Sequence, residues 1–439
     1  MTQTDEPVQA QPGAGAAGEP FPDRVPSLWQ NRAFLTFWFG ESISLLGTQV
    51  TTLALPLTAI DAFHADDREV GVLRFCQLLP YICLALPIGV WTDRMRRRPL
   101  MLAANTARLL LLALVPALYR LHALDFALLL VIATTVGIAS VLFDLCWMSY
   151  VPVLVRSPAM YVEASAKMGV SSSAADVAGP GIAGALIAAM SAPLAILADA
   201  ASYLVSVVSL LLVRAPEPAP EPSGPRSVTG ELRDGLRWVL GDRLLRALAL
   251  VGACCNFSMV TVWTMFLLYA SATLHLGSAE IGGIFASASV GGLLGATISR
   301  PVISRFRAGR VYLVAQSALL LGPVLVAAAP AGGPRSLLLG LCVASFFLTY
   351  LGLGVAGVII VSLRQAMTPQ AMMGRMTAAF RTLLFGGGAL GGLFAGLLSG
   401  AVGARTALVV AAGLSAFAVL GLVLSPVNRI TAIPGTAPR

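Results

Sequence analysis

Long runs of apolar residues recur along the chain and are separated by short polar connections. A transmembrane α-helix needs about 20 apolar residues to cross the hydrocarbon core of a bilayer. The runs predict twelve membrane-spanning helices, at residues 33–60, 70–92, 100–120, 126–150, 160–190, 193–213, 246–274, 280–301, 310–329, 335–362, 369–400 and 404–425. The pattern therefore predicts an all-α, polytopic membrane protein.

Composition agrees with this interpretation and excludes several classes of function. Apolar residues make up 57% of the chain and charged residues only 11%, against about 25% charged in soluble domains. No soluble catalytic domain fits between the spans, so we expect the protein not to be an enzyme. The single lysine, Lys167, is followed by Met168, whereas a P-loop requires Ser or Thr after its lysine, which excludes an intrinsic ATPase motor.

The distribution of basic residues predicts the orientation of the chain in the membrane. The net charge of +8 comes from residues at the ends of apolar runs, so nucleic acid is not an expected partner. With both termini in the cytoplasm, 22 of the 29 basic residues fall in cytoplasmic tails and connections. The positive-inside rule then predicts cytoplasmic termini for a multi-pass protein of the inner (plasma) membrane.

A change of composition divides the apolar region into two parts. The segment APEPAPEPSGPRS, residues 215–227, is too rich in proline and charge to continue a membrane helix. We predict a disordered cytoplasmic tail (1–32), an N-terminal six-helix bundle (33–213), a cytoplasmic linker (214–245), a C-terminal six-helix bundle (246–425) and a cytoplasmic tail (426–439). Residues 231–246 of the linker have helical spacing of apolar and basic positions, typical of either a membrane-surface helix or a solvated one.

The two parts of the chain resemble each other in sequence. EVGVL from Glu69 matches EIGGI from Glu280, and Gly179 and Gly184 match Gly387 and Gly392 further along. These matches favour duplicated halves, an architecture that places a substrate site between them. The repeat therefore indicates a rocking transporter of a small molecule.

The cysteines and histidines do not form a recognisable metal site. The cysteines lie in apolar runs without a CxxC pair, and we interpret them as packing residues: Cys76, Cys83, Cys146, Cys254, Cys255 and Cys342. The histidines are far apart in the connections: His64, His122 and His275. No metal and no cofactor is therefore expected.

The connection after span two carries a glycine, an aspartate and a cluster of arginines. It reads GVWTDRMRRR from Gly89 to Arg98. Gly89 allows close helix approach, and Asp93 can accept hydrogen bonds from N–H groups at a helix start. Arg94, Arg97 and Arg98 can anchor the connection at anionic headgroups. A positive-inside loop with no further role is the alternative.

The pattern GxxxDRxxRR resembles the signature loop of the major facilitator superfamily, with Arg96 where that family usually has glycine. The resemblance implies twelve transmembrane helices in two six-helix bundles, the 6+6 major facilitator fold. It also implies a conformational latch, in which Asp93 docks on the start of span eleven and Arg97 bridges Asp93 to Asp144 on span four.

Small residues predict close helix packing in spans five and eleven. Span five contains Gly179-Pro180-Gly-Ile-Ala-Gly184, in which proline removes a helical hydrogen bond and the glycines let a neighbouring helix approach. The segment is similar to the GPxxGG element of drug antiporters, with Ala183 replacing one glycine. In span eleven, Gly388 and Gly392 belong to a stripe of glycines at four-residue spacing.

Five of the charged residues within the predicted spans are candidates for the transport pathway. A charge at the centre of a membrane helix costs about 2.5–3.5 kcal/mol on insertion scales unless it faces a cavity or a partner. Glu41 is the best candidate for the proton carrier, while Asp199 has a structural alternative and Asp176 is expected to pair with Arg381 across the halves. The proton-coupling candidates are Glu41, Asp176, Asp199, Arg108 and Arg381.

The span-one phrase NRAFLTFWFGESISLLG and the DAxSY motif at Asp199 resemble the drug:proton antiporter branch that contains macrolide and siderophore exporters. This resemblance implies a monomeric secondary active transporter that exports an amphipathic small molecule (a drug, macrolide, siderophore or other natural product) in exchange for protons by alternating access. An importer of the same fold and a non-transporting membrane scaffold or sensor are the alternatives.

Overall fold

The computed structural model describes residues 28–93, 95–155, 158–215, 217, 228–274, 276–329, 334–369 and 372–430. All regular structure in these ranges is helical, as predicted. The helices are α1 (Arg32–Phe63), α2 (Asp67–Cys83), α3 (Ala85–Asp93), α4 (Arg97–Arg120), α5 (Phe126–Val155), α6 (Pro158–Met190), α7 (Ala192–Leu212), α8 (Val228–Gly241), α9 (Arg243–Ala272), α10 (Ser278–Arg305), α11 (Ala308–Ala327), α12 (Arg335–Met367), α13 (Met373–Val402) and α14 (Ala404–Val423).

Ten of the described helices are long and apolar enough to cross a membrane: α1, α4, α5, α7 and α9–α14. The predicted span at 70–92 is divided into α2 and α3, because Pro87 lacks the N–H that would continue the helical hydrogen-bond ladder through Leu84. The predicted span at 160–190 corresponds to α6, in which Ala178–Met190 is an apolar stretch among the described residues. The prediction of a disordered tail at 1–32 is wrong for residues 28–32, where Leu28–Gln30 form a 3-10 turn and Leu28 is buried; a second 3-10 turn, Pro426–Arg429, lies in the predicted tail 426–439. The tail residues before Leu28 and after Ile430, and linker residues 218–227, lie outside the described residues.

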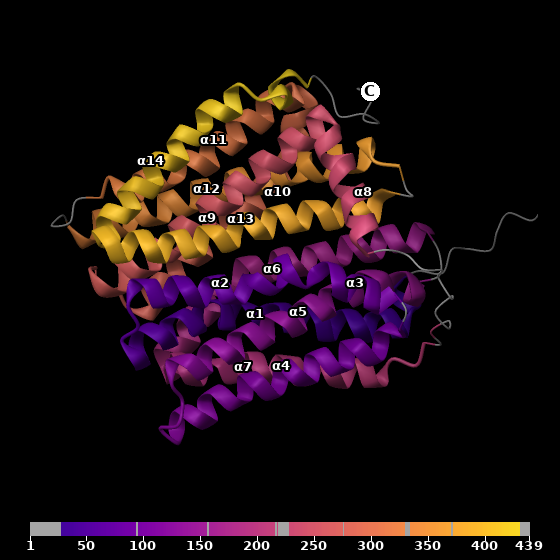
Figure 1. Cartoon of the computed structure of the whole chain (residues 1–439), viewed down its shortest axis with the longest axis horizontal. Helices are drawn as coiled ribbons and strands as arrows, with labels where there is room; N and C mark the ends of the chain where they lie inside the picture. The colour runs from indigo at the N-terminus through magenta and orange to yellow at the C-terminus, as the bar shows by residue number, and fades with distance from the viewer. Residues whose placement is uncertain are drawn as a thin grey trace, which may run out of the picture.

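The helices pack in two groups, α1–α7 and α9–α14, which Figure 1 shows as the indigo to magenta and the orange to yellow halves. The groups meet mainly where α2 packs against α13 and α6 packs against α10. Helix α8 packs against α9 and α13, and Val239 of α8 is buried in the core of the second group. The linker helix therefore lies on the second group of helices.

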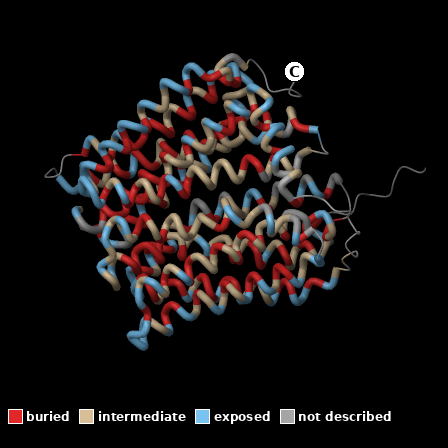
Figure 2. Tube along the Cα trace, in the orientation of Figure 1, coloured by how far each residue is buried: buried red, intermediate tan, exposed pale blue. Residues whose placement is uncertain are grey.

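Large apolar side chains are exposed on the outer faces of the helices, as the pale blue outer segments in Figure 2 illustrate. Leu110 is 63% exposed, Val131 61% and Phe417 70%. An apolar surface of this extent would aggregate in water and fits a lipid environment. Of the cysteines predicted to pack in the core, Cys146, Cys255 and Cys342 are buried, whereas Cys83 and Cys254 are exposed, so the packing interpretation is wrong for these last two.

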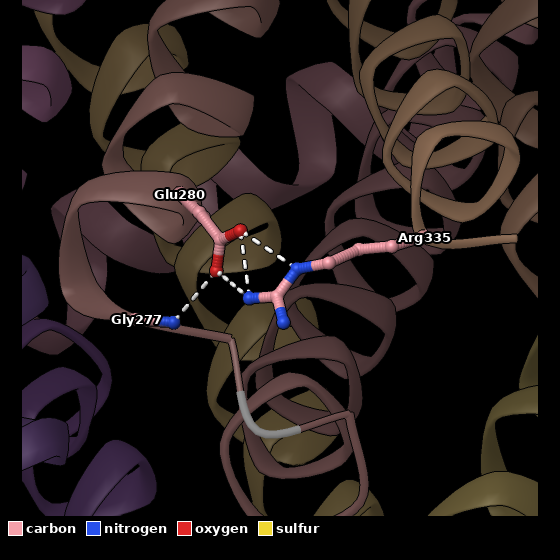
Figure 3. A network of polar contacts seen from close by, with 3 residues as sticks. All are labelled: Gly277, Glu280 and Arg335. Atoms are coloured by element: carbon pink, nitrogen blue, oxygen red, sulfur yellow. Dashed lines mark hydrogen bonds and ion pairs between the residues drawn. The ribbon is translucent and has the colours of Figure 1, made fainter.

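The sequence repeat is also a repeat of local structure. Glu69 accepts a hydrogen bond from the Asp66 N–H at the start of α2 (2.8 Å), and Glu280 accepts one from the Gly277 N–H at the start of α10 (2.9 Å). Glu280 additionally binds the guanidinium of Arg335 at the start of α12, at 2.7 and 2.8 Å from Nη2 (Figure 3). In the first copy of the repeat the glutamate caps α2. In the second copy it caps α10 and also links α10 to α12 through Arg335.

We call the end of the bundle that holds α3 and α8 the linker end, and the opposite end the far end. At the far end the two groups touch through glycines. A Cβ atom added at Gly71 of α2 would lie 2.5 Å from the Cα of Gly396 on α13, and one added at Gly282 of α10 would lie 2.6 Å from the Cα of Gly184 on α6. Backbone meets backbone at both crossings, so the two groups are closed against each other at the far end.

Gly282→Ala is expected to lower the free energy of unfolding by about 1–3 kcal/mol relative to Gly283→Ala, because the new methyl group overpacks the crossing with α6. Gly283 is the matched control, since a Cβ atom there meets nothing within 4 Å and both variants gain the same helix propensity. Unfolding of the two purified variants, followed by circular dichroism, measures the difference. Equal stability would show that the α6–α10 crossing is not tightly packed.

Candidate functional site

A buried cluster of polar side chains lies between α1, α4 and α7. Glu41 on α1 is 6% exposed, Arg108 on α4 is 5% exposed, and Asp199 on α7 is 1% exposed. Burial of this many charges inside apolar helices is costly unless the charges compensate one another or carry a function. The structure thus brings together three of the five charged residues that the sequence singled out.

Arg108 is held in place from several sides. Its Nη2 donates to Oδ1 of Asn105, and its Nη1 donates to the hydroxyl of Tyr203 at 3.3 Å. Its guanidinium lies 4.5 Å from the ring centroids of both Phe143 and Tyr203. Cation–π contacts of this kind stabilise a desolvated guanidinium by about 2 kcal/mol. Arg108 is therefore a fixed positive charge inside the first group of helices.

Glu41 has a different environment. Its Oε2 atom is buried and has no hydrogen-bond partner among the described residues. The positive charge of Arg108 and the negative charge of Asp144 are both close enough to interact with it. A buried carboxylate that lacks hydrogen-bond donors binds a proton more readily than one fixed by several donors, so Glu41 is suited to take up a proton.

Asp199 is enclosed in the contact between α1 and α7. Its Oδ1 accepts a hydrogen bond from Ser202 at 3.0 Å, and a Cβ atom added at Gly47 of α1 would lie 2.6 Å from the same oxygen. The Oδ2 atom has no partner among the described residues. This tight packing leaves the structural alternative for Asp199 open beside the proton-carrying one.

A second polar contact joins the two groups of helices. The Tyr81 hydroxyl on α2 donates to Oδ2 of Asp144 on α5 at 2.9 Å, and Nη2 of Arg381 on α13 lies 3.9 Å from the same oxygen. Tyr81 also stacks on Phe385 of α13, with 4.5 Å between ring centroids. Asp144 therefore pairs with an arginine of the opposite group.

This contact bears on two of the predicted pairings. Arg381 lies against Asp144, whereas its pairing with Asp176 stays a prediction, because the side chain of Asp176 lies outside the described residues. The predicted bridge from Arg97 to Asp144 and Asp93 is not seen among the described contacts; the side chain of Asp93 and all of Arg94 lie outside the described residues. Sequence alone could not separate these pairings, because several arginines have the right charge.

The backbone of the arginine cluster holds the linker instead. The Arg97 and Arg98 N–H groups at the start of α4 donate to the Glu217 carboxylate at 2.6 and 3.2 Å. A carboxylate is favoured at this position because the first N–H groups of a helix lack partners and carry the positive end of the helix dipole. The Arg98 side chain caps α7 by donating to the carbonyl groups of Leu210 and Leu211, each at 2.9 Å.

The predicted helix-packing residues behave differently from one another. A Cβ atom added at Gly179 would lie 2.5 Å from Gln49, and one at Gly388 would lie 2.5 Å from Asn256, so helices approach closely at both glycines. Gly184 and the Pro180 carbonyl oxygen face Gly282, and Gly392 faces the stem of Arg74. The described residues do not show the close approach expected at Gly89, because among them a Cβ atom there would meet only Leu145, at 3.9 Å.

A cavity of about 290 Å³ lies between the two groups of helices. It is lined from the first group by α1, α2 and α6, and from the second by α9, α10 and α12. Its walls combine an arginine, Arg74, with the aromatic side chains of Trp263, Phe285 and Tyr350. A mostly apolar cavity with few polar groups between two related halves is the usual form of a transporter substrate site.

Arg74 is the main residue that sequence reasoning did not select. It was only counted among the basic residues near spans, because α2 is short and its sequence does not show which face looks inward. The structure shows the inward face, because Val70 and Gly71, one helical turn before Arg74, are buried.

Comparisons with known proteins agree with the membrane fold. A sequence profile of the Major Facilitator Superfamily matches residues 37–392. The multidrug efflux pump Tap of Mycolicibacterium fortuitum is 26% identical over 375 residues, which cover 81% of this chain and 87% of that protein.

Two solved structures share the fold at low sequence identity. A POT family transporter in complex with 5-aminolevulinic acid superposes with a TM-score of 0.71 at 13% identity, covering 90% of this chain and 96% of that one. A bacterial homologue of the human lysosomal transporter Spinster, in an inward-facing and unoccupied conformation, gives a TM-score of 0.67 at 16% identity, covering 92% and 98%. At such identities the likeness concerns the fold alone.

Proposed function

The chain belongs to the Major Facilitator Superfamily, and from this membership we propose that it is a proton-coupled exporter of an amphipathic small molecule. It is a transporter and a multi-pass membrane protein, not an enzyme. The direction of transport is proposed from the relative named a multidrug efflux pump. Proton coupling is proposed from one observation in particular, the buried Glu41 carboxylate beside Arg108.

The geometry supports a specific route from proton binding to conformational change. Arg108 is close enough to interact with both Glu41 and Asp144. When Glu41 takes up a proton, it no longer balances the charge of Arg108, and Arg108 then attracts Asp144 more strongly. Asp144 is thereby drawn away from Arg381, its partner in the opposite half. Protonation inside one half thus loosens a contact between the halves.

Alternating access follows from the same proposal. The two halves, 33–213 and 246–425, rock about the central cavity, with the glycine crossings closing the far end and the Asp144–Arg381 pair acting nearer the linker end. We propose that the linker end is cytoplasmic in the inner (plasma) membrane and that a monomer is sufficient for transport. The latch between Asp93, Arg97 and the start of α13 stays part of this proposal.

Transport in proteoliposomes tests the proposed function. The purified protein is reconstituted and a panel of radiolabelled amphipathic compounds, including a macrolide and a siderophore, is offered with and without a pH gradient. We expect accumulation in the direction of export that requires the gradient and disappears on addition of a protonophore. Gradient-driven movement in the opposite direction would indicate an importer, and no movement of any compound would favour a scaffold or sensor.

A further inference from the structure

Arg74 presents an unusual charge to the central cavity. None of the described residues that line the cavity is acidic, and Arg74 is the one charged side chain among them. Its Nη1 donates to Oε1 of Gln77 at 3.0 Å, and its Nε is buried without a hydrogen-bond partner among the described residues. A guanidinium has five N–H donors. Among the described residues, most of the donors of Arg74 therefore bind neither a carboxylate nor a backbone carbonyl group of the protein.

The surroundings of Arg74 fix its position without neutralising its charge. The guanidinium lies 4.5 Å from the ring centroid of Trp263 on α9. The stem of the side chain packs over Gly392 of α13, where an added Cβ atom would come within 3.1 Å of it. Arg74 belongs to the first half and both neighbours belong to the second, so the charge sits on the contact between the halves.

The rest of the cavity is suited to an aromatic or other flat apolar group. Trp263 and Phe285 lie 5.3 Å apart between ring centroids, and Tyr350 lines the same cavity. The volume of about 290 Å³ is at the small end of the range for ligand pockets, about 300–1,000 Å³. In this conformation the cavity accommodates a compact molecule rather than a whole macrolide ring.

We infer that the transported molecule carries an anionic group, such as a carboxylate, that binds Arg74, and an aromatic body that packs against Trp263, Phe285 and Tyr350. Arginine binds carboxylates through paired hydrogen bonds, which are about twice as strong as hydrogen bonds between neutral groups. A cationic amphiphile would meet an uncompensated positive charge in the same place. This inference rests on the proposed transport function and narrows its substrate class.

Binding of three molecules with one skeleton tests the inference without transport. The probes are 2-naphthoate, its neutral amide and the 2-naphthylmethylammonium cation, and their dissociation constants are measured by calorimetry on the full chain in nanodiscs of zwitterionic lipid. We expect the carboxylate to bind at least about tenfold more tightly than the cation, a difference of about 1.4 kcal/mol. This comparison uses the unchanged protein, so it does not depend on the folding of any variant.

Substitutions then test whether Arg74 causes the preference for the carboxylate probe. Arg74→Gln is expected to weaken carboxylate binding at least about tenfold, to leave the affinity for the amide almost unchanged, and to remove the preference over the cation. Arg74→Lys should keep part of the preference. Arg68→Gln on the same helix is the matched control, because Arg68 lies beside Gly400 towards the far end and does not line the cavity.

Three results would overturn the inference: equal or tighter binding of the cation, a charge preference that survives Arg74→Gln, or no binding of any probe. Failure of the proposed function is a separate result. If the carboxylate binds through Arg74 but no pH gradient drives its movement in proteoliposomes, proton-coupled export is wrong and the anion site stands. If a cation is exported with the gradient, export stands and the anion site is wrong.

Discussion

Glu41→Gln is expected to abolish pH-gradient-driven export while leaving the folded protein in the membrane. Glutamine keeps the shape and polarity of the buried side chain but cannot bind or release a proton at physiological pH. Because position 41 would then stay neutral at every pH, the charge beside Arg108 would no longer change with the proton gradient. We expect gradient-driven transport in proteoliposomes to fall at least about tenfold, in the range that loss of a proton-transferring group produces. Exchange of substrate across the membrane without a pH gradient should continue.

Glu163→Gln provides the control for this experiment. Glu163 is also a glutamate on a membrane helix, but its side chain is 48% exposed and pairs with Lys167, at 3.6 Å between Nζ and Oε1. Exposed pairs of this kind contribute little, so the control should transport normally. Wild-type dependence of transport on pH in Glu41→Gln would remove Glu41 from the mechanism.

Arg381→Asp is expected to reduce transport at least about tenfold, because it places a second acid beside Asp144 in a partly buried site. Like charges at this position push α5 and α13 apart and oppose closure of the two halves near the linker end. The swapped pair, Asp144→Arg with Arg381→Asp, restores opposite charges and should recover part of the activity. Initial rates for the two single variants and the double variant form a double-mutant cycle.

The cycle separates a coupled pair from two independent residues. A coupling free energy of about 0.5–3 kcal/mol is expected for residues in contact. Additive losses, with no recovery in the swapped pair, would show that the 3.9 Å approach of Arg381 to Asp144 has no role in transport. Tyr81→Phe in the otherwise unchanged protein should lower the transport rate, because the Tyr81 hydroxyl holds the Asp144 carboxylate in position.

The membrane character, the helical fold and the family could all be predicted from the sequence. These properties depend on local and additive features: the length of apolar runs, the scarcity of charge, and one short motif after span two. The duplication was visible for the same reason, because Glu69 and Glu280 cap equivalent helices through contacts within four residues of sequence. The break between α2 and α3 was missed even though Pro87 stands there, since a membrane span tolerates proline in many contexts.

The pairing of the intramembrane charges depends on the packing of the helices and could not be predicted from the sequence. Glu41, Arg108 and Asp144 are on three different helices, and Arg381 comes from the opposite half, so their proximity depends on the rotation of each helix about its own axis. A membrane helix has apolar surroundings on all sides, so it lacks the amphipathic pattern that identifies the inward face of a helix in a soluble protein. For this reason the sequence could name the intramembrane charges but not pair them, and it gave no weight to Arg74 at the central cavity.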